Sequence, residues 1–239
     1  MTQAHEILEP FTALWWETIL WSIGIIWGLL YFAKKMTPKQ ISYLIIFSGV
    51  VLNARTLLFQ PYMVYTHQWD IYNSLPLHLC GLSAIISGVI MFYRKQWLYE
   101  LLYFWGIPGA FHSLITPEFT HGTRGLFFIE YYIAHGGIIF SALFCTLILG
   151  FKPSKGSWWR VFLWTQLLLP VIGGFNWLIG ANYMYLCEPP IVSNPFVIGD
   201  FPEHLIGLEI AGLLHFALVY LPFGLRYRNE SKSTGTPLI

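Results

Sequence analysis

A cysteine and two histidines lie within apolar stretches of this sequence, where reactive side chains are rare. Cys80 follows His78 in Leu75-Pro-Leu-His-Leu-Cys80, and His135 precedes two glycines in Ile133-Ala-His-Gly-Gly137. A thiolate attacks ester carbonyls when a nearby base accepts its proton. His78 is two residues away and points to another face of a helix, so His135 is the candidate base. The alternative is that Cys80 is an inert apolar residue, as isolated cysteines often are.

Further polar residues occur at a similar distance from one end of their apolar stretches. At about 1.5 Å per helical residue, this distance places them in the outer half of a membrane. Polar groups that serve packing alone have no reason to share a depth, so we predict a polar cavity that binds substrate. The candidate substrate-binding residues are Asn53, Arg55, His112, Glu130, Asn176 and Glu209, with His215 near mid-bilayer.

Each of these residues also has a packing explanation. Arg55 is predicted either to hold a lipid phosphate or to form a buried ion pair with Glu130 or Glu209. Asn53 and Asn176 are predicted to form hydrogen bonds between helices or, together with His78, to be candidate donors to an oxyanion.

The composition indicates the environment of these residues. Of 239 residues, 56% are hydrophobic and 10% are charged, compared with roughly 25% charged in soluble domains. Aromatic residues make up 18%, which suits a protein with two membrane interfaces. A net charge of +1 excludes nucleic acid as a partner. Three cysteines without a Cys-x-x-Cys pair indicate neither a disulfide scaffold nor a structural metal, and we expect no cofactor.

Seven apolar segments are long enough to cross a membrane, since a helix needs about 20 residues to span roughly 30 Å of hydrocarbon. We predict an all-α, polytopic membrane helix bundle of seven transmembrane helices in a single domain over 1–228, followed by a flexible cytoplasmic tail over 229–239. Prolines in 183–203 exclude a continuous helix and predict an ordered loop or lid. The predicted segments are 14–33, 41–60, 75–93, 97–116, 125–150, 158–182 and 204–225.

Basic residues predict the orientation, because short loops rich in Lys and Arg stay in the cytoplasm. They follow the first, third, fifth and seventh segments, all on one side, whereas the opposite side carries acidic residues and Arg124. We therefore predict an external N-terminus and a cytoplasmic C-terminus in an integral protein of the bacterial plasma membrane. The expected partners are membrane phospholipids or lysophospholipids.

Four stretches carry a resemblance to a known family: Leu75–Cys80, Trp105-Gly-Ile-Pro-Gly-Ala-Phe-His112, Ile133–Gly137 and Asn176-Trp-Leu-Ile-Gly-Ala-Asn-Tyr183. In them the chain resembles the YwaF-like family of bacterial integral membrane proteins. The eukaryotic relatives of that family are multispanning lipid acyltransferases, similar to the androgen-induced-protein type of intramembrane hydrolases. The resemblance implies a catalytic pair at Cys80 and His135, although the androgen-induced group has Thr at the cysteine position.

These observations predict an intramembrane lipid acyltransferase or acyl hydrolase. In this hypothesis Cys80 attacks a phospholipid acyl ester and forms a thioester, and His135 accepts the proton. One alternative is a small-solute transporter or receptor. Another is a zinc-dependent hydrolase, which is disfavoured because no two histidines have the spacing of a same-face pair; its ligands would come from His78, His112, His135 and His215.

Overall fold

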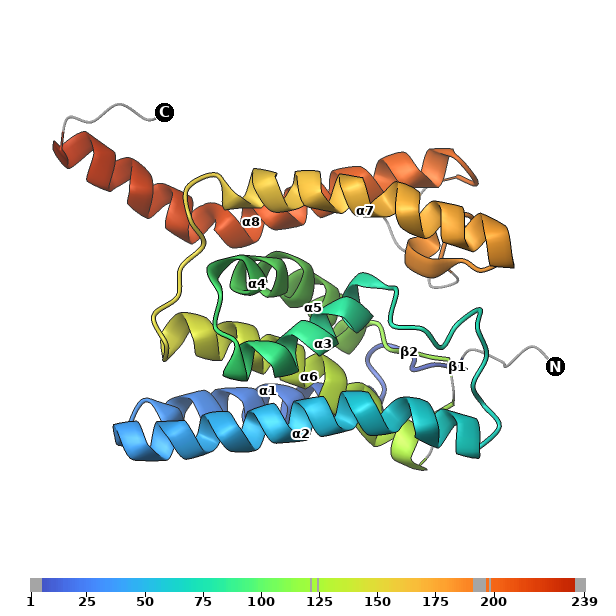
Figure 1. Cartoon of the computed structure of the whole chain (residues 1–239), viewed down its shortest axis with the longest axis horizontal. Helices are drawn as coiled ribbons and strands as arrows, with labels where there is room; N and C mark the ends of the chain where they lie inside the picture. The colour runs from blue at the N-terminus through green and yellow to red at the C-terminus, as the bar shows by residue number, and fades with distance from the viewer. Residues whose placement is uncertain (1–5, 121, 124, 191–196, 198, 235–239) are drawn as a thin grey trace.

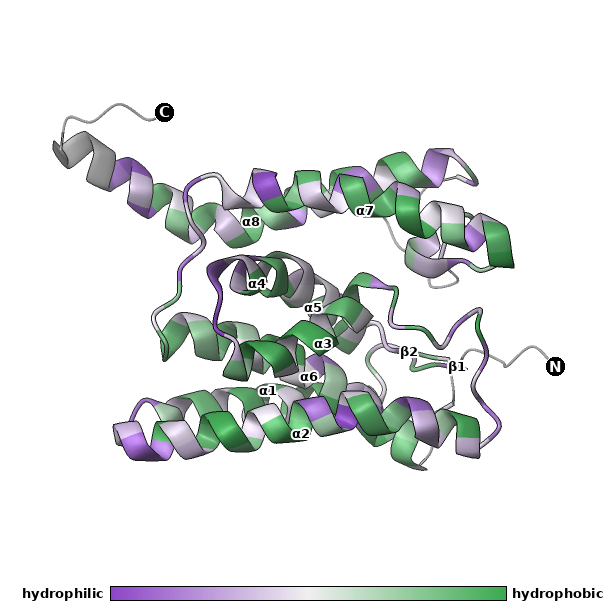
Figure 2. Cartoon of the chain, in the orientation of Figure 1, coloured by the Kyte–Doolittle hydropathy of each residue, from purple (hydrophilic) through white to green (hydrophobic). Residues whose placement is uncertain are grey.

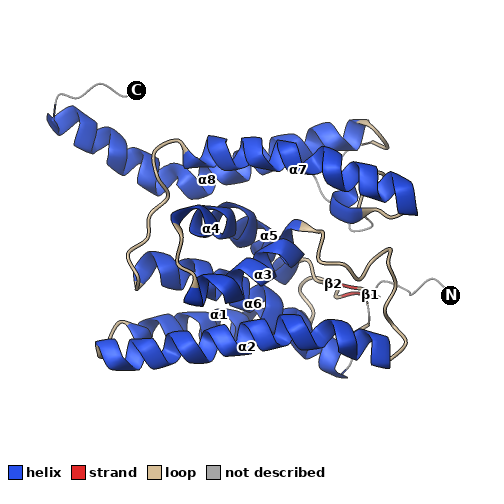
Figure 3. Cartoon of the chain, in the orientation of Figure 1, coloured by secondary structure: helices blue, strands red, loops and turns tan. Residues whose placement is uncertain are grey.

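The computed structural model describes residues 6–120, 122–123, 125–190, 197 and 199–234. Figures 1 and 3 show a bundle of helices with one short pair of antiparallel strands, β1 (Glu6–Ile7) and β2 (Glu118–Phe119), which the sequence did not predict. The helical elements are α1 (Ala13–Ala33), α2 (Pro38–Tyr65), α3 (Leu79–Phe92), α4 (Gln96–Leu101), the π-helix η1 (Leu102–Gly106), α5 (Ile107–Ile115), α6 (Gly125–Leu147), α7 (Ser157–Ile179), the 3₁₀ turn η2 (Tyr183–Tyr185) and α8 (Glu203–Thr234).

Among the described helices, five are long and apolar enough to cross a membrane: α1, α2, α6, α7 and α8. The third predicted segment, 75–93, is helical only over the 14 residues of α3. His78 is the N-cap of this helix, so Pro76 lies in the turn before it, although the predicted segment began at residue 75. The backbone of Pro76 packs so closely on Gly81 that a Cβ there would lie 2.8 Å from the Pro76 Cα.

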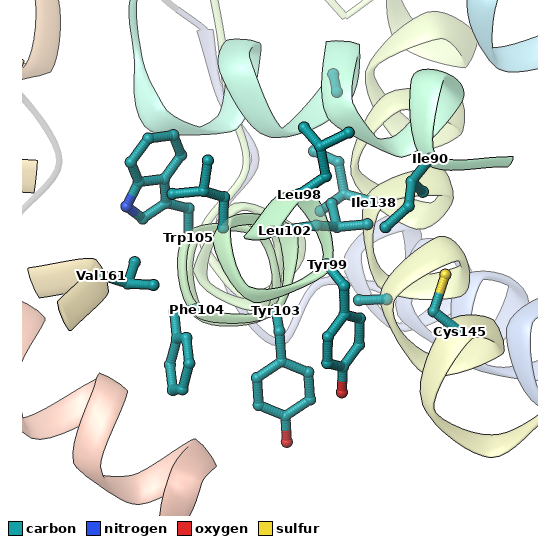
Figure 4. Close-up of a cluster of buried hydrophobic side chains, with 14 of the residues drawn as sticks. Ile90, Leu98, Tyr99, Leu102, Tyr103, Phe104, Trp105, Ile138, Cys145 and Val161 are labelled. Carbon is teal, nitrogen blue, oxygen red and sulfur yellow. The ribbon is translucent and has the colours of Figure 1, made fainter. Parts of the chain in front are cut away.

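The fourth predicted segment, 97–116, forms three consecutive helical pieces, α4, η1 and α5. All five residues of η1 are buried, and the largest hydrophobic cluster surrounds this element. Figure 4 shows its side chains pointing in several directions, toward Ile90, Ile138 and Val161 of the neighbouring helices. This composite helix is therefore the centre of the core.

The outer helices expose apolar faces. In Figure 1, α1 and α2 lie on one side of the composite helix, and α7 and α8 lie on the other. Figure 2 shows hydrophobic residues along all four, and exposed examples are Trp21, Leu57, Leu167, Trp177 and Leu218. Helices with apolar surfaces of this extent require a lipid environment, because soluble proteins rarely expose contiguous apolar patches of such size.

The basic loops gather at one end of the bundle. Figure 1 shows the α1–α2, α3–α4 and α6–α7 connections and the C-terminal part of α8 at that end, and the two strands at the other. The basic residues on which the predicted orientation rests therefore share one end, which we call the basic-loop end. Arg124 lies outside the described residues. Because α8 reaches Thr234, the tail predicted over 229–239 begins within a helix, and 235–239 also lie outside the described residues.

Candidate active site

A cavity of about 1140 Å³ lies among α2, α3, α5, α6, α7 and α8. Its lining is mostly apolar, and polar residues of each of these helices also line it. Seven of the nine predicted site residues line it, and Asn53 and Asn176 do not. The seven are Arg55, His78, Cys80, His112, Glu130, His135 and Glu209.

Cys80 is the second residue of α3 and is half-buried. The first N–H groups of a helix have no partner within it, and no side chain caps α3. The Cys80 Sγ lies 3.8 Å from the Ser113 Oγ, which in turn donates to the Gly109 carbonyl at 3.0 Å. Because the Ser113 proton is used in that bond, the thiol is the donor to Ser113. The nucleophile candidate thus lies at the positive end of a helix, next to two residues of α5.

His135 on α6 has a fixed tautomer. Its Nδ1 lies 2.8 Å from the Tyr131 carbonyl, which can only accept, so Nδ1 carries the proton and Nε2 of the neutral ring is an acceptor. The two rings pack with centroids 4.3 Å apart. Tyr131 also donates its hydroxyl proton to the Ser113 carbonyl at 2.8 Å. Ser113 and Tyr131 therefore connect Cys80 with His135, although the thiol bonds to Ser113 and not to the imidazole.

His78 contacts the loop that follows α7. Its Nδ1 accepts a hydrogen bond from the Met184 N–H at 3.2 Å, so the proton of the neutral ring is on Nε2. The ring also packs against two tyrosines of η2, with centroids 5.5 Å from Tyr183 and 5.2 Å from Tyr185. His78 is thus a hydrogen-bond donor at the cavity wall, two residues before Cys80.

The three predicted charged residues of the cavity have two different sets of partners. Arg55 of α2 forms an ion pair with Glu130 of α6, and its guanidinium lies 5.6 Å from the Phe59 ring centroid. Glu209 of α8 instead accepts a hydrogen bond of 2.6 Å from Gln166 of α7. Of the two acidic partners that the sequence left open for Arg55, the structure selects Glu130.

Two further histidines form a hydrogen-bonded pair between α5 and α8. The Nε2 atoms of His112 and His215 are 2.8 Å apart, and the His215 Nδ1 donates to the Ala211 carbonyl at 2.6 Å. This assigns the shared proton to His112. Within the described part of the chain, no three His, Cys, Asp or Glu side chains are grouped as a metal site requires, so the zinc alternative gains no support from the geometry.

The side chains of both asparagines bind backbone groups, and neither residue lines the cavity. The Asn53 Nδ2 donates to the Gly49 carbonyl at 2.7 Å, and its amide packs against Gly88 of α3. Asn176 is buried, and its side chain forms two hydrogen bonds with the backbone of Tyr183, at 2.9 and 3.0 Å. Both contacts are structural, but the predicted hydrogen bonds between helices are not what forms: the Asn53 bond lies within α2, and the Asn176 bonds reach the turn that follows α7.

Sequence reasoning missed Ser113, Tyr131, Gln166 and Tyr185, which also line the cavity. Ser113 directly follows His112, and Tyr131 lies one helical turn before His135, so helical spacing from the predicted residues was a usable signal for both. Tyr185 belongs to a loop, and nothing in its local sequence indicates that the loop returns to the cavity.

The helices and the cavity define a multi-pass membrane protein with a cysteine and histidines in an internal space. The TMEM164 family model matches residues 1–220, and the chain belongs to this family. An uncharacterized protein of Treponema pallidum (strain Nichols) is 31% identical over 152 residues, which cover 63% of this chain and 63% of that relative. No solved structure matches the chain. The YwaF-like resemblance and its link to acyltransferases stay predictions.

Proposed function

We propose that the protein transfers or hydrolyses acyl chains of membrane phospholipids through a thioester on Cys80. The observation that carries this proposal is the position of Cys80 at an uncapped helix N-terminus, in one cavity with an imidazole whose Nε2 is free to accept a proton. A helix N-terminus favours negative charge nearby, which stabilises a thiolate. Low-dielectric surroundings strengthen that interaction.

The reaction has two steps. The Cys80 side chain turns from Ser113 toward His135, and its proton moves to Nε2 as sulfur bonds to the acyl carbonyl carbon and the π electrons move to oxygen. The intermediate expels the lysophospholipid oxygen, which takes the proton back from His135 and leaves the acyl thioester. A second hydroxyl, from another lysophospholipid or from water, repeats these transfers and restores the thiol.

The proposed substrate also suits the other cavity residues. The apolar lining accepts acyl chains, and Arg55 lies where a phosphate could replace part of its pairing with Glu130. His112, with its tautomer set by His215, is a second polar contact for the lipid headgroup region. Glu209, held by Gln166, is a third.

The proposed membrane placement has seven crossings, with α3 and the composite α4–η1–α5 each counted as one, an external N-terminus and a cytoplasmic C-terminus. It is supported by the shared position of the basic loops. The proposed location is the bacterial plasma membrane. A tag after Ile239 should be protected from external protease and a tag before Met1 should be cleaved, and two tags with equal protection would refute this topology.

Thiol labelling tests the nucleophile. A lipid-like maleimide should label Cys80 in a variant in which Ser replaces both Cys145 and Cys187. Cys145 is fully buried and is the matched control, expected to label slowly when it is the only cysteine. His135→Ala should suppress labelling of Cys80 more than His78→Ala does.

Turnover tests the thioester. With phospholipid in nanodiscs, Cys80→Ser should lower turnover by orders of magnitude, because a lone imidazole deprotonates a hydroxyl poorly, while lipid binding persists. Hydroxylamine should release a trapped acyl chain from the unmodified protein. Lipid turnover by Cys80→Ala at the unmodified rate would refute the proposed function and favour a cavity that binds without cleaving.

A further inference from the structure

The η2 turn holds two consecutive residues in a conformation that side chains disfavour. Met184 and Tyr185 have φ angles of 58° and 56°, in the left-handed region that is uncommon for residues other than glycine. Such strain persists where the surroundings hold it in place, and it gathers at functional sites. Here His78 accepts from the Met184 N–H, and the buried His204 donates to the Tyr185 carbonyl at 2.8 Å.

The strained turn places the Tyr185 ring at the cavity wall beside the reactive residues. Tyr185 lines the same cavity as Cys80, and its ring centroid is 5.2 Å from that of His78. The phenol also interacts electrostatically with Glu118 and with Cys80. Burial raises the pKa of Tyr185 above its usual value, which keeps the phenol protonated as a donor.

The two tyrosines of η2 differ in what their hydroxyls do. The Tyr183 hydroxyl donates to the Ile71 carbonyl at 2.7 Å and accepts from the Leu75 N–H at 3.1 Å. Over the residues that the structure describes, the Tyr185 hydroxyl has no hydrogen-bond partner, and it is not among the polar atoms sealed from solvent. Tyr183 therefore fastens the turn, whereas Tyr185 lines the cavity and its hydroxyl is left unused.

We infer that the Tyr185 hydroxyl, together with the Nε2–H of His78, donates to the oxyanion that forms when Cys80 attacks an acyl carbonyl. The inference rests on the proposed function. Negative charge develops on the carbonyl oxygen as the S–C bond forms, and donors fixed in advance stabilise it without reorganisation. As the intermediate collapses, the C=O bond reforms, the ester C–O bond breaks, and both donors keep their protons.

Other candidate donors that the sequence suggested are already engaged. The Asn53 amide donates to Gly49, and Asn176 is clamped to the backbone of Tyr183. His78 remains from the predicted set, because only its Nδ1 is used by Met184. Tyr185 supplies the second donor, and the strained turn explains how a loop residue is held with the accuracy that this role needs.

The test compares two reactions of Cys80 that differ in one respect. Acylation by 4-nitrophenyl palmitate passes through an oxyanion, whereas alkylation by an iodoacetamide probe does not. Tyr185→Phe keeps the ring and removes the hydroxyl, so it should slow acylation by about 10²–10³ and leave KM and the alkylation rate within twofold. Tyr227→Phe is the matched control: it removes a hydroxyl that donates to the Pro153 carbonyl at 2.9 Å, away from the cavity lining, and should keep the kcat of the unmodified protein.

The outcomes separate the inference from the proposed function. Acylation of Cys80→Ala at the unmodified rate, or no acylation of the unmodified protein, would refute the proposed function. If Cys80→Ala is inactive while Tyr185→Phe keeps its acylation rate, or raises only KM, the oxyanion role of Tyr185 is wrong and the nucleophile stands. Equal slowing of acylation and alkylation by Tyr185→Phe would assign the residue to folding of the site and would also overturn the inference.

Discussion

At the basic-loop end, Glu100 is buried with every part of its carboxylate occupied. Its Oε1 accepts from the Gln96 amide at 2.9 Å and from the Ser154 N–H and hydroxyl at 3.0 and 2.6 Å, and its Oε2 accepts from Arg160 at 2.6 Å. This network ties the α6–α7 connection to α4 and leaves no capacity for a ligand.

At the cavity end, by contrast, several groups keep a donor or acceptor in reserve. His135, His78 and Tyr185 line the cavity, and in each of them one atom is bound to the protein while the His135 Nε2, the His78 Nε2–H or the Tyr185 hydroxyl has no partner among the described residues. A carboxylate whose hydrogen bonds are all made within the protein stabilises the fold, whereas a polar group with an unused donor or acceptor can bind a ligand. Substitutions at the two ends should therefore be measured by different properties.

The largest expected effect on stability is at the basic-loop end. Glu100→Ala should lower the free energy of unfolding in detergent by about 3–5 kcal/mol, because it breaks a buried charged network. Alkylation of Cys80 in the folded protein should be unchanged. Lys155→Ala, an exposed residue of the same connection, is the control and should cost less than about 0.5 kcal/mol. Loss of Cys80 reactivity in folded Glu100→Ala would contradict the separation of the two ends.

At the cavity end, Gly109→Val should affect reactivity more than stability. A Cβ at Gly109 would lie 3.0 Å from the Cys80 sulfur, so the larger side chain displaces the thiol and should slow acylation by about 10². Gly28→Val in α1, where no atom lies within 4 Å of the added Cβ, should leave the rate unchanged. Equal rates for both variants would show that the thiol position does not depend on α5.

A substitution that disturbs the turn before α3 should have a smaller effect than the two changes above. Gly81→Ala places a Cβ 2.8 Å from the Pro76 Cα, and because backbone cannot easily move aside, the free energy of unfolding should fall by about 1–3 kcal/mol. Gly136→Ala on α6, with open space around its Cβ, should stabilise the helix by up to about 1 kcal/mol. Thermal unfolding of the two variants side by side checks the difference, and a neutral Gly81→Ala would contradict it.

The smallest effect is a change in substrate preference at Arg55. Because the Arg55 and Glu130 side chains are 20% and 12% exposed, water can partly replace their pairing, and Arg55→Gln should cost less stability than Glu100→Ala. It should raise KM about tenfold for phospholipid, which corresponds to about 1.4 kcal/mol, and leave KM for 4-nitrophenyl palmitate unchanged. An equal rise for both substrates would exclude a phosphate contact.

The sequence predicted the helices well where one apolar stretch makes one helix, as in α1, α2, α6, α7 and α8. It could not predict that α3 begins only at Leu79 or that 97–116 contains a π-helix, because hydropathy does not report on backbone hydrogen bonding. Cys80 and His135, which the sequence placed at a similar depth, line one cavity in the structure. Arg55 and Glu130 are 75 positions apart in the sequence, and His78 and Met184 are 106 apart. Only tertiary packing determines such contacts, so the sequence could not predict them.

The π-helix η1 makes the number of residues in the segment Leu102–Gly106 more important than which apolar residues occupy it. A π turn adds a residue to a helix, and each added residue rotates the remainder of the helix by about 100°. Deleting one residue from Leu102–Gly106 would leave an apolar helix of nearly the same span but would turn Gly109 and Ser113 away from Cys80. Single-residue deletions here should therefore be tolerated far less than conservative substitutions, since the segment sets the rotational phase of α5.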